Sequence, residues 1–311
     1  MRILVVGAGA IGGFFGGRWL AAGRDVTFLV RERRAAQLAK IGLVVKSKLG
    51  DVDVPSPPTV SAETVKGPYD LILLSCKAFD LEGAMESFAP AVGPDTAILP
   101  LLNGIAHLDA LGKRFDKRNV LGGQVGISAT LDPEGRVLHL NDGMFLSYGE
   151  LAGGKSKRVE AIAAEFAAAK VTATASDTAL LDMWEKWVLI ASVAGVTCLM
   201  RSAIGDVIAA GGQPLIEALH AELIAIATVN GFAPRAEVLP RQRALLLAKG
   251  SPFTASMLRD TEAGSRIEAD HVIGDLLARA KGEAPVLKTA YTHLKAYEAR
   301  RAREAKPTAK P

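Results

Sequence analysis

The sequence predicts an α/β protein in which a doubly wound parallel sheet comes first and a mostly α-helical C-terminal domain follows. Three observations lead to this prediction. Short apolar runs alternate with helical patterns in the first half of the chain, a glycine-rich turn follows the first run, and strand patterns are lacking after Ser176. Strands that alternate with helices are typical of parallel sheets with crossover helices. We therefore expect two domains, at 1–176 and 177–303, and a disordered tail at 304–311.

The individual elements follow from the spacing of apolar residues. Strands are expected at 3–6, 26–30, 71–75, 97–101, 120–127 and 171–175, and helices at 12–22, 32–41 and 155–170. Residues 136–140 and 144–148 flank Asn141-Asp142-Gly143, a turn sequence that predicts an antiparallel hairpin. Later helices are expected from Ser176 or Asp177 through Val188, and at 214–230, 236–249, 267–281 and 285–300.

The composition is that of an ordinary globular protein. Of the 311 residues, 49% are hydrophobic and 23% are charged, which excludes a disordered or fibrous chain. The net charge of +4 is small, and part of it lies in the basic stretch 295–310. Because aromatic residues are not interleaved there and nucleic-acid motifs are lacking, we expect a solvated helix end and no nucleic-acid partner.

The cysteines and the apolar segments bear on the compartment. Cys76 and Cys198 form neither a metal-ligand spacing nor a disulfide framework, which favours free thiols in a reducing compartment. The longest strongly apolar segment, 188–200, is shorter than the about 20 residues that a bilayer requires. We expect a cytoplasmic protein with no membrane contact. The scattered histidines, including His271 close to Glu268, suggest no metal site.

The first apolar run leads into a glycine-rich turn, Gly7-Ala8-Gly9-Ala10-Ile11-Gly12. Gly7 permits a tight turn, Gly9 lets the backbone approach a pyrophosphate, and Gly12 allows close packing of the next helix on the strand. The helix N-terminus then offers free amide hydrogens to the phosphates. This order of strand, GxGxxG and helix predicts a Rossmann-type dinucleotide site.

The end of the second expected strand indicates which dinucleotide binds. NAD enzymes usually carry an acidic residue there, which binds the ribose 2′-hydroxyl. Here Arg31 follows the strand, and Arg33 and Arg34 come next after Glu32. A guanidinium pairs well with the additional 2′-phosphate of NADP. We therefore expect NADPH to bind through Arg31, although a solvated helix start would give the same cluster.

Several spaced motifs together resemble the ketopantoate reductase (2-dehydropantoate 2-reductase) family over residues 1–297. Beyond the glycine turn and Arg31, they are Ser75-Cys76-Lys77-Ala78, Leu102-Asn103-Gly104, Trp184-Glu185-Lys186, and Ser256–Asp260 followed by Glu268-Ala269-Asp270. The resemblance implies NADPH-dependent reduction of a 2-oxo acid, with ketopantoate reduced to pantoate in pantothenate biosynthesis as the first expectation.

The resemblance also implies roles for individual residues. Lys77 and Asn103 would reach the nicotinamide ribose and the reacting region, so that Asn103 contacts both cofactor and substrate. Lys186 would be the general acid and touch the substrate. Ser256 would bind the substrate carboxylate, and Glu268 would be an acidic catalytic partner that orients substrate, cofactor or Lys186.

The chemistry supports a lysine in this place. Hydride transfer to a ketone builds negative charge on the carbonyl oxygen, and an ammonium group can stabilise that charge and deliver a proton. The alternative for Lys186 is a surface lysine that lies along the apolar bodies of Trp184 and Trp187. Likewise Glu268 could be an exposed acid, and Ser256 could cap a helix.

The sequence departs from the family where the substrate is recognised. The family has asparagines four, eight and eighteen residues after the lysine, and these positions are Ile190, Ala194 and Ile204 here. Ile190 and Ala194 would then line a substrate pocket that rejects hydroxylated molecules, because their polar groups would be buried unpaired. Thr197 could replace one lost contact, and Arg201 could bind a carboxylate.

This departure leaves alternatives open. The protein could reduce a more apolar 2-oxo acid or ketone, it could be a β-hydroxyacid dehydrogenase, or it could be a non-catalytic NADPH-binding sensor that has lost its substrate. The leucine- and alanine-rich helices of the second domain are compatible with a homodimer, which the sequence does not decide.

Overall fold

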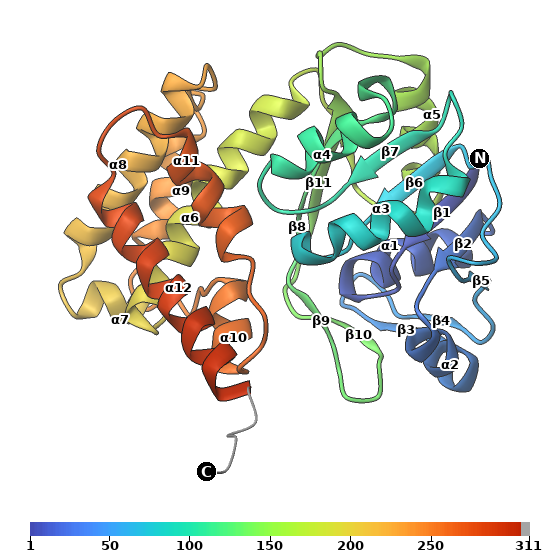
Figure 1. The fold of residues 1–311 in the computed structure, drawn as a ribbon, viewed down its shortest axis with the longest axis horizontal. Helices are drawn as coiled ribbons and strands as arrows, with labels where there is room; N and C mark the ends of the chain where they lie inside the picture. The colour runs from blue at the N-terminus through green and yellow to red at the C-terminus, as the bar shows by residue number, and fades with distance from the viewer. Residues whose placement is uncertain (306–311) are drawn as a thin grey trace. The chain divides into compact units, whose positions relative to one another are not determined.

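The computed structural model describes residues 1–305, and the chain divides into two compact units, one from Met1 to Met183 and one from Trp184 onward. The division falls inside helix α6 (Ala179–Met200), whereas the sequence placed it before that helix, at Ser176. The first unit is α/β and the second is helical, which confirms the predicted fold class (Figure 1).

The first unit is built on a five-stranded parallel sheet in the order β5-β2-β1-β6-β7. The strands are β1 (Arg2–Val6), β2 (Asp25–Leu29), β5 (Thr59–Val60), β6 (Leu71–Leu74) and β7 (Ala97–Pro100). The strand order reverses between β1 and β6, which makes this the topological switch point of the sheet. Open α/β sheets bind ligands at the carboxyl ends of their strands at such a point.

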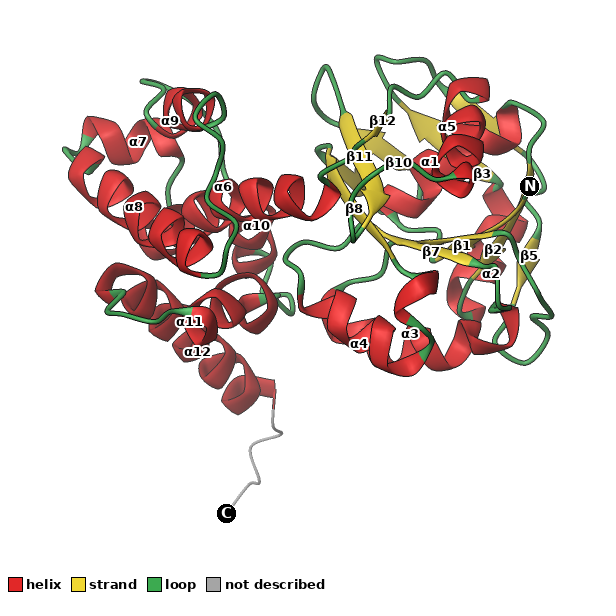
Figure 2. Ribbon diagram, turned by 90° about the horizontal axis from the view of Figure 1, so that it is seen from above, coloured by secondary structure: helices red, strands yellow, loops and turns green. Residues whose placement is uncertain are grey.

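Helices cover both faces of this sheet, as Figure 2 shows. They are α1 (Ala10–Ala21), α2 (Glu32–Ile41), α3 (Leu81–Phe88), α4 (Ala106–Arg114) and α5 (Lys157–Ala168). Alternate residues of β1 point to opposite faces: Ile3 and Val5 pack with α1 and α5, and Leu4 and Val6 pack with α3 and α4. The continuous apolar runs of the sequence are therefore strands buried on both faces.

Two smaller sheets complete the first unit. One has the order β4-β3-β10-β9 and the other β12-β11-β8. Their strands are β3 (Leu43–Lys46), β4 (Val52–Val54), β8 (Leu121–Gly126), β9 (Ala129–Leu131), β10 (Val137–His139), β11 (Phe145–Glu150) and β12 (Thr174–Ala175).

The hairpin predicted around Asn141-Asp142-Gly143 is wrong. Strands form on both sides of it, but β10 and β11 belong to different sheets. β10 instead pairs antiparallel with β9, through a turn in which Gly135 takes the positive φ of 91°. The Asn141 side chain accepts a hydrogen bond from the Ser128 backbone N–H at 2.8 Å, so it ties the start of the connection to another loop.

The second unit contains α6 and a series of further helices. They are α7 (Ile204–Ala209), α8 (Gln213–Val229), α9 (Leu239–Leu246), α10 (Ser256–Glu262), the π-helix η4 (Asp270–Gly274), α11 (Asp275–Arg279) and α12 (Pro285–Ala305). α7 and α10 were not predicted. The helix expected at 267–281 forms over most of that range, as the π-helix η4 followed directly by α11.

The end of the chain differs in part from its prediction. Glu304 and Ala305 continue helix α12 and do not start a disordered tail. The rest of the predicted tail, 306–311, lies outside the described residues.

Helix α6 is long and apolar enough to cross a membrane by length and composition alone. However, 72% of its most apolar 18-residue window is buried inside the structure. Such burial is typical of the core helix of a folded domain, and composition alone is weak support for a span.

Candidate active site

The glycine turn has the geometry that a bound pyrophosphate needs. Gly7 follows β1 with a φ of 91°, and Gly9 precedes the first residue of α1. A Cβ atom added to Gly9 would meet no atom within 4 Å, whereas one added to Gly12 would lie 2.0 Å from the Gly7 carbonyl oxygen. Gly12 is therefore required for packing, and the backbone at Gly9 is open for a phosphate group to approach. These residues fit a dinucleotide.

Ser75, Lys77 and Asn103 follow strands of the same sheet edge as the glycine turn. Ser75 and Lys77 follow β6, and Asn103 follows β7. The Ser75 hydroxyl donates a hydrogen bond to the Val6 carbonyl oxygen at 3.2 Å, so the loop after β6 touches the start of the glycine turn. The Lys77 side chain is exposed and that of Asn103 is half-buried. The fold thus places both predicted cofactor residues at the carboxyl edge of the sheet, Lys77 after a strand of the switch point and Asn103 after the next strand.

Arg31 precedes helix α2, at the position expected for a residue that contacts the adenosine ribose. Its side chain is 79% exposed, and its guanidinium pairs with the Asp80 carboxylate at 2.8 Å. This pairing raises the pKa of Arg31, so the side chain carries its positive charge. Sequence reasoning missed Asp80, because 49 residues separate the two partners and no local pattern joins them.

Arg34 forms hydrogen bonds with the backbone of the glycine turn and of a neighbouring loop. Its Nε donates to the Ala8 carbonyl oxygen at 2.8 Å, and an Nη donates to the Gly135 carbonyl oxygen at 2.9 Å. The guanidinium therefore joins the turn to the β9–β10 connection. The sequence indicated only a basic cluster here and gave Arg34 no role of its own.

Lys186 is half-buried on α6, and the two tryptophans that flank it in the sequence, Trp184 and Trp187, are buried. Burial lowers the pKa of its ammonium group to about 8, and the Glu268 carboxylate opposes this shift by favouring the charged form. Glu268 is itself half-buried and lies just before η4. The second unit thus brings the two predicted catalytic residues within electrostatic reach, and a group that titrates near neutrality suits proton transfer.

The three apolar residues that stand where the family has asparagines differ in how exposed they are. Ile190 and Ala194 lie on the face of α6 that carries Lys186, because residues four apart in a helix are neighbours. Ile190 is half-buried, whereas Ala194 is 3% exposed and Ile204, the first residue of α7, is fully buried. Ile190 is therefore the replacement with the most open side chain.

Thr197, suggested for a lost asparagine contact, and Arg201, suggested for a carboxylate, are placed differently. The buried Thr197 hydroxyl donates to the Val193 carbonyl oxygen at 2.7 Å and accepts from the Ala255 backbone N–H at 3.4 Å. It serves the fold. Arg201 follows the end of α6, is exposed and has a φ of 51°.

Ser256 is exposed and begins α10. Because the capping position of this helix is Ala255, Ser256 is not its N-cap. Its hydroxyl is thus not required by that local structure, and the structure leaves it accessible.

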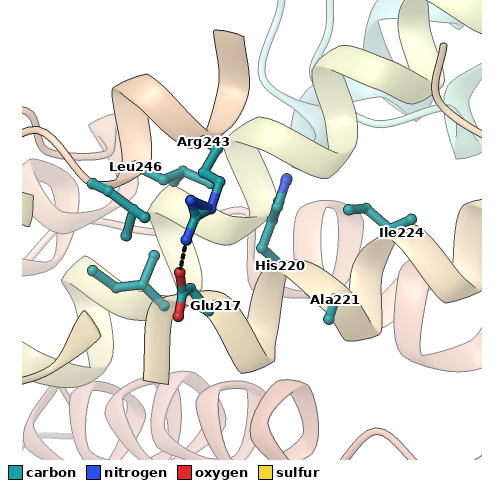
Figure 3. Close-up of a pocket in the computed structure, with 8 residues that line it drawn as sticks. Glu217, His220, Ala221, Ile224, Arg243 and Leu246 are labelled. Atoms are coloured by element: carbon teal, nitrogen blue, oxygen red, sulfur yellow. Dashed lines mark hydrogen bonds and ion pairs between the residues drawn. The ribbon is translucent and has the colours of Figure 1, made fainter. Parts of the chain in front are cut away.

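A hollow of about 260 Å³ on the second unit is separate from these residues (Figure 3). Helices α8 and α9 form it, mostly with apolar side chains, and Arg243 pairs with Glu217 beside it. None of the residues predicted for catalysis lines it. Within residues 1–305, no group of three or more His, Cys, Asp or Glu side chains is arranged to hold a metal ion.

The sheet and the glycine turn are those of a dinucleotide-binding domain. Together with the family and relatives that follow, they make the protein an oxidoreductase that uses a nicotinamide cofactor and acts on a CH–OH group. Residues 3–153 match the family described as ketopantoate reductase PanE/ApbA, and residues 178–298 match the C-terminal domain of the same family. The chain belongs to the ketopantoate reductase family.

Individual relatives agree with this assignment. An uncharacterized oxidoreductase of Bacillus subtilis is 35% identical over 303 residues, which cover 96% of this chain and 99% of the relative. A 2-dehydropantoate 2-reductase of Halobacterium salinarum is 25% identical, with 93% and 96% of the two chains covered. The crystal structure of 2-dehydropantoate 2-reductase from Methylococcus capsulatus superposes with a TM-score of 0.87 at 26% identity and 99% coverage of both chains.

A similar fold is also found in an enzyme that is named for a different reaction. The structure of a D-mandelate dehydrogenase with NADH and anilino(oxo)acetate has a TM-score of 0.86 at 22% identity, and covers 97% of this chain and all of the other. At this identity the likeness concerns the fold alone.

Proposed function

We propose that the protein is a cytoplasmic, NADPH-dependent 2-oxo acid reductase in which Lys186 donates the proton, and that ketopantoate is its first candidate substrate. The observation that carries this proposal is the half-buried Lys186 ammonium, whose pKa is lowered to about 8 beside Glu268. If ketopantoate is the substrate, the reaction belongs to pantothenate biosynthesis.

We assign cofactor binding to the first predicted domain and proton donation and substrate binding to the second. Residues 1–176 would bind the cofactor through Gly7, Gly9, Arg31, Lys77 and Asn103. Residues 177–303 would carry the proton donor and the substrate contacts, with Ser256 on the carboxylate.

The reaction adds two electrons and two hydrogens to the keto group. NADPH, when bound, would supply the hydride that the carbonyl carbon accepts. The Lys186 ammonium stabilises the negative charge that develops on the carbonyl oxygen and then transfers its proton to that oxygen, which leaves a neutral amine. Glu268 favours the charged form of the lysine before the reaction and so keeps it ready to donate.

Arg31 supports the choice of NADPH. Its guanidinium is 79% exposed, and its partner Asp80 is bound through a surface ion pair, which is typically worth only about 0–1 kcal/mol. A 2′-phosphate can therefore replace Asp80 at little cost and gain a bidentate, charge-assisted contact.

A more apolar 2-oxo acid is the second candidate substrate, and Ile190 favours it. The side chain is partly open on the lysine face of α6, and it offers no hydrogen bond to the hydroxyl group of ketopantoate. Burial of that hydroxyl without a partner would cost about 1–3 kcal/mol.

The direct test is NADPH consumption with a panel of 2-oxo acids, in which ketopantoate is compared with trimethylpyruvate, the same molecule without the hydroxyl group. The proposal expects rapid NADPH oxidation with at least one of them, and the ratio of kcat/KM values identifies the substrate class. If NADPH binds but no 2-oxo acid is reduced, the protein is a cofactor-binding sensor and the proposed reaction is wrong.

A further inference from the structure

A chain of two hydrogen bonds connects the lysine helix to the backbone of Glu268. The Trp187 indole N–H donates to the Val272 carbonyl oxygen at 2.8 Å, and the Val272 backbone N–H donates to the Glu268 carbonyl oxygen at 3.0 Å. Trp187 and Val272 are 1% and 3% exposed, so water does not compete for these bonds. Trp187 is the residue next to Lys186 on α6.

The segment held in this way is an unusual one. Val272 lies in the π-helix η4, and Glu268 lies in the irregular residues just before it. A π turn is rare in proteins, and such turns are frequent at functional sites. A segment of this kind depends on tertiary contacts for its position, and the indole supplies one of them.

We propose that Trp187 is a positioning residue whose indole N–H holds the Glu268 segment against α6, so that the Glu268 carboxylate remains beside Lys186. This deepens the function proposed above, because Glu268 there keeps the lysine charged. It assigns Trp187 a role that its neighbour Trp184 does not share.

Trp184 provides a matched control within the same helix. It is also 1% exposed, and the two rings lie 5.0 Å apart. Among residues 1–305, however, its buried indole N–H has no hydrogen-bond partner. Replacing either tryptophan with phenylalanine removes similar volume, but only the change at Trp187 removes a hydrogen bond to the Glu268 segment.

Other charged groups on the packed elements have partners of their own. On α6, Glu185 pairs with Arg235, and on α11, Asp275 pairs with Arg279. On η4, Asp270 binds Lys295 and the Tyr291 hydroxyl, and His271 is the other titratable side chain of this turn. The bonds of Asp270 also attach η4 to α12, so we expect the loss of the indole bond to shift the segment locally and not to unfold it.

The test measures the pKa of Lys186 without any substrate. The purified full chain is labelled with a trace of acetic anhydride over a range of pH, and mass spectrometry of the Lys186 peptide gives the titration of its amine. The Glu268→Gln variant shows how far the pKa of Lys186 shifts when the carboxylate charge is lost. An opposite charge at close range typically changes a pKa by about one unit or more.

We expect Trp187→Phe to lower the pKa of Lys186 in the same direction as Glu268→Gln, by roughly half a unit or more, and Trp184→Phe to leave it unchanged. If Trp187→Phe leaves the pKa unchanged while Glu268→Gln lowers it, or if Trp184→Phe lowers it equally, Trp187 does not position Glu268. An unchanged pKa in Glu268→Gln would also overturn the inference.

A second variant guards against a folding defect. Site-specific incorporation of 3-benzothienylalanine at position 187 keeps the bicyclic ring and replaces the N–H with sulfur, so it removes the donor at nearly constant shape. The same fall in the Lys186 pKa is expected, and an unchanged value overturns the inference. Because no turnover is measured, a failure of the proposed reductase activity would be seen separately, in the panel of 2-oxo acids.

Discussion

Lys186 occupies a position in which its charge is costly to the folded protein. Its pKa is lowered from the ordinary 10.5 to about 8 because burial removes water from the ammonium group. The folded chain therefore binds this proton more weakly than the unfolded chain. The resulting penalty on stability is full below about pH 8 and disappears as the pH rises through the ordinary value.

This cost predicts that removing the charge stabilises the fold. Lys186→Met should raise the free energy of unfolding by up to about 3 kcal/mol at neutral pH, because each pKa unit corresponds to about 1.4 kcal/mol. Urea unfolding at several pH values measures it. The difference should shrink above about pH 8, and a variant that is less stable at neutral pH would show that the ammonium group is not desolvated.

A second residue-scale prediction concerns the cofactor. Arg31→Ala should weaken NADPH binding by at least roughly tenfold and change NADH binding little, because only NADPH carries the 2′-phosphate. Fluorescence titration with both cofactors measures it. Asp80→Asn is the matched control, since it frees Arg31 and should improve NADPH binding. Equal losses for both cofactors in Arg31→Ala would remove the 2′-phosphate role.

The third residue-scale prediction concerns Ile190. Ile190→Asn should raise the kcat/KM ratio of ketopantoate to trimethylpyruvate by about tenfold, because the amide can bind the hydroxyl group. Ile190→Leu keeps the volume and the apolar character, and it should leave this ratio unchanged. If both variants change the ratio equally, the side chain acts through shape and not through a hydrogen bond.

At the scale of elements, the β1–α1 turn separates packing from binding. Gly12→Ala puts a Cβ atom against the Gly7 carbonyl oxygen and should destabilise the fold by about 1–3 kcal/mol. Gly9→Ala meets no atom within 4 Å, so the fold should keep its stability while the methyl group hinders the pyrophosphate. Thermal unfolding and NADPH titration check both variants. If Gly9→Ala binds NADPH with normal affinity, the pyrophosphate does not bind against the backbone of Gly9.

The elements also show what local sequence determines. Strands β1, β2, β6 and β7 of the large sheet and helix α2 are predicted well, because buried runs and helical spacing are local signals. The partner of a strand is not local: β10 and β11 flank a good turn sequence, yet each pairs in a different sheet. Strands as short as β5, with two residues, have no period to detect, and the π turn η4 interrupts the helical period expected at 267–281.

The candidate site was predictable to a similar extent. The glycine turn follows from its own spacing. Lys77 and Asn103 came from the family resemblance, with which their places after β6 and β7 agree. Lys186 needed the family resemblance, because a lysine between two tryptophans has an ordinary structural explanation. Asp80 and Trp187 could not be found, since their contacts join residues 49 and 85 positions apart.

At the scale of the whole molecule, the proposed reaction assigns a different part to each unit. In this proposal the first unit would bind the dinucleotide at the switch point of its sheet, and the second would supply Lys186, whose pKa is lowered to about 8. Reduction consumes the proton on Lys186, so its rate should fall as the pH rises through about 8. The reverse oxidation needs the neutral amine, so its rate should rise over the same range.

The most direct measurement is the rate of NADPH oxidation in a single turnover, recorded for the wild-type chain and Lys186→Ala from about pH 6 to pH 10 with the best 2-oxo acid of the panel. The wild-type rate should decline through about pH 8. Lys186→Ala should bind NADPH normally, react about 10²–10⁴ times more slowly, and lose this decline. A variant that reacts at the wild-type rate would show that Lys186 is not the proton donor.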